Sequence, residues 1–573
     1  MIILILILGL FLRLINLNQS LWLDETVQAI TSKGSFLGIF TELRGDFHPP
    51  LYHLLMWGWA HLFGNGEIVM RLPSVIFGVA TIWVVYKIVR SWELGVRSKE
   101  TGVRRREIGV RREEIGVRRE EKETQNSELR TLPLIAALFL ATAPFHIYYS
   151  QEARTYAMTT FFTALSMYYF IRLVRSQELG VRNGESGDRS QETGVRSEES
   201  GDGSQERGEK DLAFRTPVSE LNTQNLKYIL FTTLMLYSDY YGIFVFLAQI
   251  IAAAIIFRKK FLSKYLSKYL YIYISIFLLF LPCLPLLWLQ LKTGSQATTF
   301  LPEWGRLVNL SFLKALPLTF IKFSIGRITI FNKTLYAIVV GILFVIYGGM
   351  ILIGFRGQGL ATSRKKNYLL DPSRQSLITI LFWFLVPILL AWGISFFVPN
   401  YQPFRLLLAL PAFYLLLAFG ISKFSTPMIR IIGIIFILLV NLISLGVYYQ
   451  NPYFHREDWR GAVGYIESQD GKSSLALIPS ETSHWPYDYY SQGKVPLWGV
   501  AKGFNKVGSQ ELGDRSQNSV LRTQYSHIYY IYYLADLFDP QNLIPNWLEK
   551  QNFVKIREVS FNQIRIQEWE RNE

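Results

Sequence analysis

The hydrophobic residues of this chain lie in long blocks separated by shorter polar tracts. A hydrocarbon layer about 30 Å thick requires roughly 20 apolar residues in a helix that rises 1.5 Å per residue. Eleven runs approach that length: residues 1–17, 72–90, 132–148, 155–175, 227–240, 241–257, 269–290, 334–355, 376–398, 404–420 and 428–448. The pattern therefore predicts an all-α polytopic membrane protein. We expect the first run to stay as a helix rather than act as a cleaved signal peptide, because no basic region precedes it and no small-residue cleavage site follows before Trp22.

Lysine and arginine gather in every second linker between these runs. Basic linkers follow Arg90 and Arg175, span 258–268 and 356–366, and include Lys423 and Arg430, whereas 18–71 and 399–403 are acidic or neutral and rich in aromatic residues. The linker 291–333 alternates with the basic linkers and is also rich in aromatic residues, but its lysines and arginines outnumber its single acid. Because cytoplasmic loops carry the excess of Lys and Arg, the N-terminus is expected in the cytoplasm. An odd number of spans then places the C-terminal tail outside. The expected location is the cytoplasmic membrane, crossed many times.

The chain divides into a membrane domain over 1–448 and a small extracytoplasmic α/β domain over 449–573. In the tail, a helix is expected over 457–466 and strands over 475–478, 525–533 and 554–569. Seven-residue repeats such as ETGVRRR fill the linkers 91–131 and 176–226, and a fragment recurs near 507–526. Each unit carries a glycine and at most two apolar residues, so no coiled-coil seam can form. These tracts are interpreted as solvated low-complexity insertions.

Composition narrows the class of protein further. A single cysteine, Cys283, excludes a disulfide framework, a cysteine-based zinc site and a dithiol redox motif. The formal net charge of +15 resides mostly in the predicted cytoplasmic linkers. It indicates contact with membrane lipids rather than with nucleic acid.

Ionisable residues that stand directly at the ends of the predicted spans are the candidates for chemistry. Asp24 and Glu25 follow the first span, and Trp22 would anchor them at headgroup depth. Gln151, Glu152, Arg154 and Tyr156 stand between two spans with no room for a true loop. An arginine there either snorkels to the headgroups with Glu152 as its partner or clamps a phosphate with its fixed fork of donors.

Two further sites face the same predicted side. The hairpin that contains Tyr401 places Arg405 at the start of the next span, so that two cations would meet one leaflet. Tyr148, Tyr149, Tyr240 and Tyr241 form aromatic clusters at span ends, and such clusters build either an interfacial belt or a platform for stacking sugars. His48, His146 and Glu152 could bind a divalent metal, although a histidine before Pro-Pro more often fixes a loop by hydrogen bonding.

The order of these motifs resembles a known family. An Asp-Glu pair at the membrane edge is followed by HPPLY with His48 and Tyr52, then RLPS, then YYSQEARTYAM, then Tyr401 with Arg405, and finally DWR at 458–460. This order is similar to that of bacterial members of glycosyltransferase family 39, which has the GT-C membrane fold. The family includes dolichyl-phosphate-mannose protein mannosyltransferases and the aminoarabinose transferases of lipid A. The resemblance covers nearly the whole chain outside the insertions.

The resemblance implies a hexosyl- or pentosyl-type glycosyltransferase that moves a sugar from a polyprenyl-phosphate carrier to an acceptor hydroxyl on the outer face. It implies Asp24 as the general base with Glu25 beside it, and Arg154, Arg405 and Tyr401 on the carrier phosphate. His48, Tyr52, Gln151, Glu152, Tyr156 and Tyr241 would line the substrate pocket. A divalent metal stays open, and no other cofactor is expected. The acceptor could be lipid, glycan or protein, but the chain has no region like the large lumenal repeats of the eukaryotic mannosyltransferases, which argues against protein.

Two other classes of protein fit part of the pattern. A transporter or flippase of lipid-linked saccharides would also have many spans and basic cytoplasmic linkers. Such proteins usually place ionisable residues near the middle of the membrane, whereas here the charges gather at the span ends. An anchoring protein that binds a partner through its tail is the third reading, in which the linkers have only a structural role.

Overall fold

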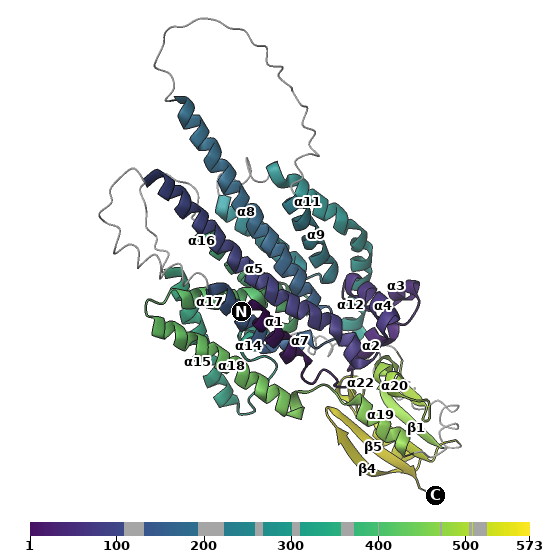
Figure 1. Ribbon diagram of the computed structural model, residues 1–573. Helices are drawn as coiled ribbons and strands as arrows, with labels where there is room; N and C mark the ends of the chain where they lie inside the picture. Colours follow the sequence, from purple (N-terminus) through teal and green to yellow (C-terminus); the bar gives the residue numbers. More distant parts are fainter. Residues whose placement is uncertain are drawn as a thin grey trace, which may run out of the picture.

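The computed structural model describes residues 1–107, 131–192, 223–257, 267–300, 310–356, 372–398, 400–469, 473–502, 507 and 524–572. The chain forms a bundle of helices with a small sheet domain against one end, which we call the sheet end (Figure 1). The greater part of each predicted low-complexity insertion lies outside the described residues. The first repeats of two insertions continue the preceding helices, since α5 runs over Glu67–Glu107 and α8 over Tyr156–Glu192.

Within the described residues, seven helical segments are long and apolar enough to cross a membrane. They are Glu67–Ser91, Tyr156–Arg175, Tyr269–Gly294, Lys333–Phe355, Gln375–Ile394, Pro403–Ser422 and Pro427–Gln450. An eighth span is bent by 59° between Thr131–Thr142 and α7 (Pro144–Ser150). Proline at the start of α7 explains the bend, because its ring removes a backbone donor. These spans confirm the predicted polytopic helical fold.

Three of the eleven predicted spans form shorter helices. They are α1 (Ile2–Leu14), α9 (Thr223–Ser238) and α10 (Gly242–Phe257). A helix of 13 residues such as α1 is only about 20 Å long, which is less than the apolar thickness of a bilayer. The polar turn at 239–241 separates α9 from α10. The length criterion therefore gives seven or eight spans, where the sequence pattern suggested eleven.

The other labelled helices of the bundle include those that form the later spans and the shorter helices beside them. They are α2 (Leu23–Thr31), α3 (Phe36–Glu42), α4 (Leu51–Phe63), α11 (Ser267–Phe280), η3 (Leu281–Cys283), α12 (Leu284–Phe300), α14 (Phe312–Ile325), α15 (Lys333–Arg356), α16 (Pro372–Ile394), η4 (Pro403–Ala409), α17 (Leu410–Ser422) and α18 (Pro427–Gln450). The span made of η4 and α17 is the most enclosed of these, because 89% of its apolar 18-residue stretch is buried. It is thus the central helix, and η4 brings Arg405 to its first turn.

The tail forms a five-stranded sheet in the order β2-β1-β3-β5-β4. Its strands are β1 (Ser474–Ser480), β2 (Leu497–Ala501), β3 (His527–Ile531), β4 (Phe553–Phe561) and β5 (Ile564–Arg571). Its helices are η5 (Pro452–Phe454), α19 (Trp459–Ser468), η6 (Glu481–Ser483), α20 (Trp485–Tyr490), α22 (Ala535–Phe538) and α23 (Leu543–Lys550). Strands β1, β2 and β3 run parallel, and β5 pairs antiparallel with β3 and β4.

One predicted strand of the tail is in fact a hairpin. The alternation over 554–569 suggested a single strand, but Asn562 and Gln563 turn the chain between β4 and β5. Gln563 takes φ of 62°, a left-handed conformation that a non-glycine residue adopts mainly in turns. The apolar positions change phase between Phe561 and Ile564, and the prediction of a single strand did not take this change into account.

The sheet domain is fastened to the bundle by polar contacts at the sheet end. The Leu21 amide donates to the Tyr490 hydroxyl at 2.7 Å, and that hydroxyl donates to Glu67 at 2.6 Å. Arg460 also contacts Glu67, at 2.8 Å. The tail therefore contacts the segment between α1 and α2, which leads into the candidate site.

Candidate active site

Asp24 lies in the first turn of α2, where the helix dipole favours a negative charge. Its carboxylate remains 35% exposed, and Oδ2 lies 3.4 Å from Nη2 of Arg154. The two residues are far apart in sequence, and the start of α2 meets the 151–155 turn at this point. The structure thus brings together the predicted base and one predicted phosphate ligand.

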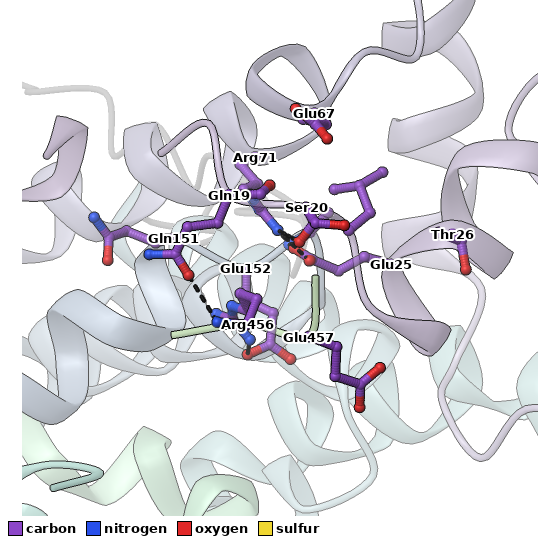
Figure 2. A network of polar contacts seen from close by, with 12 residues as sticks. Gln19, Ser20, Glu25, Thr26, Glu67, Arg71, Gln151, Glu152, Arg456 and Glu457 are labelled. Carbon is purple, nitrogen blue, oxygen red and sulfur yellow. Dashed lines mark hydrogen bonds and ion pairs between the residues drawn. The ribbon is translucent and has the colours of Figure 1, made fainter. Parts of the chain in front are cut away.

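Glu25 is fully buried, unlike its neighbour. Its Oε1 accepts from Arg71 Nε at 2.9 Å, and its Oε2 accepts from Arg71 Nη2 at 2.5 Å (Figure 2). Oε1 also accepts from the Ala153 amide at 2.8 Å. Arg71 also donates to the carbonyls of Leu17 and Ser20. Burial alone would raise the pKa of Glu25, but Arg71 holds it below its ordinary value. This arrangement fits a residue that positions the loop and Asp24.

Glu152 is buried and pairs with a residue of the tail. Arg456 Nη1 lies 2.8 Å from Glu152 Oε2 (Figure 2). The Arg456 guanidinium also lies 4.1 Å from the centroid of the Tyr148 ring. The backbone amide of Arg456 also donates to Gln19 at 2.8 Å. The partner of Glu152 is therefore Arg456 and not Arg154, the partner that the snorkelling interpretation expected.

Arg154 and Arg405 both lie near the aromatic pair formed by Tyr156 and Phe404. The Arg154 guanidinium is 6.0 Å from the Tyr156 ring. Arg405 is 5.8 Å from the Phe404 ring, whose centroid is 5.2 Å from that of Tyr156. The Nε atoms of both arginines are buried without a hydrogen-bond partner among the described residues. Burial alone would lower the pKa of Arg154, but Asp24 and the other nearby acids hold it well above its ordinary value.

His48 brings a third unpartnered nitrogen to this cluster. Its ring is 6.0 Å from that of Tyr156, and its Nε2 is buried with no partner in the described part of the chain. Its Nδ1 lies 2.8 Å from Asp46, which also contacts His53 at 2.9 Å. Burial would raise the pKa of Asp46, yet the two histidines and Arg154 hold it well below its ordinary value. We call Arg154, Tyr156, His48 and Arg405 the cationic cluster.

Tyr241 and Tyr401 support Arg405 rather than presenting free hydroxyls. The Tyr241 hydroxyl donates to the carbonyl of Asn400 at 2.7 Å, and its ring lies 5.9 Å from the Arg405 guanidinium. The Tyr401 hydroxyl bonds to Thr319 of α14 at 2.7 Å. Both contacts fix the segment that precedes η4, so they set where the guanidinium of Arg405 lies.

Tyr52 and Gln151 hold backbone close to Arg154. The Tyr52 hydroxyl lies 3.4 Å from Ser74, which donates to the Arg154 carbonyl at 3.3 Å. Gln151 donates to the carbonyls of Arg13 and Ile15 and accepts from Tyr448. Both side chains are buried and form these hydrogen bonds with other residues of the bundle.

Sequence reasoning missed the cations Arg71 and Arg456, which pair with the two buried carboxylates. A buried carboxylate requires a cation beside it, so the expectation that Glu25 and Glu152 are buried would have predicted a cationic partner for each. Arg71 opens the RLPS motif, and Arg456 is the first arginine after the last span. The DWR motif at 458–460 is structural here: Asp458 caps α19, Trp459 donates to Glu457, and Arg460 reaches Glu67.

The three residues considered for a metal bind different partners. His48 contacts Asp46, His146 lies 2.7 Å from an Arg13 nitrogen, and Glu152 pairs with Arg456. In the part of the chain that the structure describes, no group of three His, Cys, Asp or Glu side chains is arranged to hold a metal ion. The candidate site therefore consists of the side chains named above.

Glu457 predicts a pH-dependent stability. Burial raises its pKa to about 7, although hydrogen bonds from Trp459 and Tyr533 oppose the shift. Because the folded pKa exceeds the ordinary value of 4.5, the contribution of Glu457 to stability is complete below pH 4.5 and is lost as the pH rises to about 7. We expect the free energy of unfolding of Glu457→Gln to decrease with rising pH by about 1–2 kcal/mol less than that of the parent protein. Thermal unfolding of the purified protein between pH 5 and pH 8 measures it.

A matched control for this prediction is Glu549→Gln, which changes an exposed carboxylate on α23. It should leave the pH dependence as in the parent protein. An equally steep pH dependence in the Glu457 variant would show that other groups set it.

Comparison with known proteins places these residues in context. Residues 47–93 match the family model for dolichyl-phosphate-mannose-protein mannosyltransferases. This segment contains His48, Tyr52 and Arg71. No curated protein sequence matches the chain.

Solved structures give a similarity over the whole chain. ArnT from Cupriavidus metallidurans, in its apo state and bound to undecaprenyl phosphate, matches with a TM-score of 0.51 and 10% identity, covering 99% of this chain and 97% of ArnT. An oligosaccharyltransferase of Archaeoglobus fulgidus, tethered with an acceptor peptide, gives a TM-score of 0.46 and 12% identity, over 98% of this chain and 73% of that one. The ArnT similarity shows a shared fold. Together with the family match, it confirms the resemblance that the sequence motifs suggested.

Proposed function

We propose that this chain, whose fold is similar to that of ArnT, is a membrane glycosyltransferase of the GT-C type that moves a hexosyl or pentosyl unit from a polyprenyl-phosphate carrier to an acceptor hydroxyl on the outer face of the cytoplasmic membrane. The observation that carries the proposal is the contact of 3.4 Å between Arg154 and a partly exposed Asp24, beside two further cationic or polar groups with unpartnered nitrogens. The ArnT structure that holds undecaprenyl phosphate shares the fold and supports the choice of carrier.

In the proposed reaction, Asp24 accepts the proton of the acceptor hydroxyl. An alcohol is a poor nucleophile at neutral pH, so a carboxylate within hydrogen-bond reach assists its attack. The hydroxyl oxygen bonds to the anomeric carbon while the bond from that carbon to the phosphate oxygen breaks. The electron pair leaves with the polyprenyl phosphate, and the proton on Asp24 passes to water. One displacement inverts the anomeric centre, as with single-displacement glycosidases.

The cationic cluster supplies the second half of the chemistry. The leaving phosphate gains negative charge, and preorganised donors stabilise such charge in a site that excludes water. Arg154 and Arg405 each keep a buried Nε without a partner among the described residues, as does His48 at Nε2. An unpaired buried donor costs free energy, which a phosphate in this position would recover. The contact between Arg154 and Asp24 would set the distance from the base to the leaving group.

Binding of the carrier tests this assignment. Arg154→Gln and Arg405→Gln should each weaken binding of undecaprenyl phosphate to the purified protein by about 10- to 100-fold, because each removes a charge-assisted hydrogen bond. Microscale thermophoresis in detergent measures the affinity.

The matched control is Arg557→Gln on the exposed part of β4, which should bind the carrier like the parent protein. If both cluster variants bind undecaprenyl phosphate normally, the cluster does not hold the carrier phosphate.

A further inference from the structure

A cavity of about 410 Å³ lies between the bundle and the first residues of the tail. Its lining includes Trp22, Tyr148, Lys322, Arg327, Arg456 and Glu457. Arg154, Arg405 and Tyr156 are not among the lining residues, so this cavity is separate from the cationic cluster. Its volume lies in the range of small-ligand sites, which is roughly 300–1,000 Å³.

Positive charge dominates the cavity wall. The Arg327 and Arg456 guanidiniums lie 4.7 and 4.1 Å from the centroid of the same Tyr148 ring. Arg327 is exposed and donates to the Tyr148 hydroxyl at 3.1 Å, and Lys322 donates to the carbonyls of Arg327 and Ile328. Within the described residues, neither Lys322 nor Arg327 forms an ion pair with a carboxylate.

The one carboxylate on the cavity wall is already engaged. Glu457 accepts from Trp459 Nε1 at 2.8 Å and from the Tyr533 hydroxyl at 3.1 Å. Arg456 is matched by Glu152. Lys322 and Arg327 therefore face the cavity without an ion-pair contact to a carboxylate among the described residues, and the nearby charge of Glu152 is already paired with Arg456. Like charges gathered at one site repel each other, and an anionic ligand would relieve that repulsion.

The cavity also reaches the segment that leads to Asp24, although Asp24 itself does not line it. Trp22 lines it and immediately precedes α2, whose first turn holds Asp24. Glu457, on the cavity wall, is close enough to Asp24 for the two charges to interact. The indole nitrogen of Trp22 is buried without a hydrogen-bond partner in the described part of the chain. A ligand in the cavity would thus lie beside the segment that carries the proposed base.

We propose that this cavity holds the acceptor, and that the acceptor is a saccharide that carries a phosphate or carboxylate group. This inference rests on the proposed glycosyl transfer and names its acceptor class. The anionic group would bind Lys322 and Arg327, and a neighbouring hydroxyl would face Asp24. The tail segment 453–457 contributes to the cavity lining, and the resulting compact volume suits one or two sugar units better than an extended polypeptide.

Binding of small probes tests the proposal with the full-length protein in detergent. The probes are glucose 1-phosphate, methyl glucuronide and the neutral methyl glucoside, titrated by saturation-transfer NMR. We expect both anionic probes to bind at least about tenfold more tightly than the neutral one. The double variant Lys322→Gln/Arg327→Gln should lose this preference, and Lys322→Arg/Arg327→Lys should keep it. Arg557→Gln serves as the surface control.

The same variants separate this inference from the proposed function. Undecaprenyl phosphate should bind Lys322→Gln/Arg327→Gln within about twofold of the parent protein, which also shows that the variant is folded. Equal binding of charged and neutral probes overturns the inference, as does a preference that survives in the double variant. Inorganic phosphate that binds as tightly as glucose 1-phosphate also overturns it, because the saccharide would then contribute nothing. In each of these cases, loss of carrier binding in the Arg154 and Arg405 variants would still support the proposed function.

Discussion

Replacing Asp24 by Asn should lower the rate of sugar transfer by about 10²- to 10⁴-fold, the usual contribution of a general base. The amide has nearly the shape of the carboxylate but cannot accept the proton of the acceptor hydroxyl. The measurement is transfer of radiolabelled sugar from a polyprenyl-phosphate donor to membranes of a deletion strain, by the purified variant. Asp24 is partly exposed, and its only described ion pair is the contact of 3.4 Å with Arg154, so the fold should tolerate the change.

The control for this variant is Asp488→Asn, which alters an exposed carboxylate of the tail that is paired with His484. It should transfer sugar at the parental rate. Carrier binding gives a second readout, because Asp24→Asn should still bind undecaprenyl phosphate. A variant with full transfer activity would eliminate Asp24 as the base. A variant that loses carrier binding and transfer together would indicate that Asp24 acts by holding Arg154 in place.

Replacing Arg71 by Met should destabilise the protein by about 3–5 kcal/mol, because it leaves the buried carboxylate of Glu25 without its cation. Arg71 also ties the carbonyls of Leu17 and Ser20 to the base of α2, so the loop before Asp24 should loosen. Thermal unfolding of the purified protein measures the first effect. Proteolysis within 15–22 measures the second.

Two further variants make this prediction specific. Glu25→Gln/Arg71→Met removes both charges and should recover part of the lost stability, which a purely steric effect of the methionine would not allow. Arg460→Met breaks an ion pair in which the arginine is 53% exposed, and it should cost less than about 1 kcal/mol. A similar loss in the Arg71 and Arg460 variants would contradict the importance of burial.

The sequence predicted the helical membrane fold because apolar blocks of span length, repeated along one chain, are typical of membrane-spanning helices and rare in water-soluble domains. It also predicted that Asp24, Arg154 and Arg405 gather at one end of the bundle, since all three directly flank predicted spans on the same side. In the structure, Asp24 contacts Arg154, and Arg405 lies beside Phe404, whose ring packs against that of Tyr156. The roles of these residues in catalysis stay predictions.

The partners of the buried acids could not be read from local patterns. Glu25 pairs with Arg71 across 46 positions, and Glu152 pairs with Arg456 across 304. Hydrophobic periodicity reports which face of an element is buried, but not which distant residue meets it. The hairpin of β4 and β5 differs in this respect, because the apolar residues change phase between Phe561 and Ile564, where the chain turns.

The pairing of Glu152 with Arg456 also constrains how the molecule is assembled. During synthesis, Glu152 is made while more than half of the chain is still to follow. Until residue 456 leaves the ribosome, that carboxylate lacks its ion-pair partner and must stay hydrated or protonated. The helices around it therefore cannot close in final form before the last span has been inserted, so the maturation of the bundle waits for its own C-terminal part.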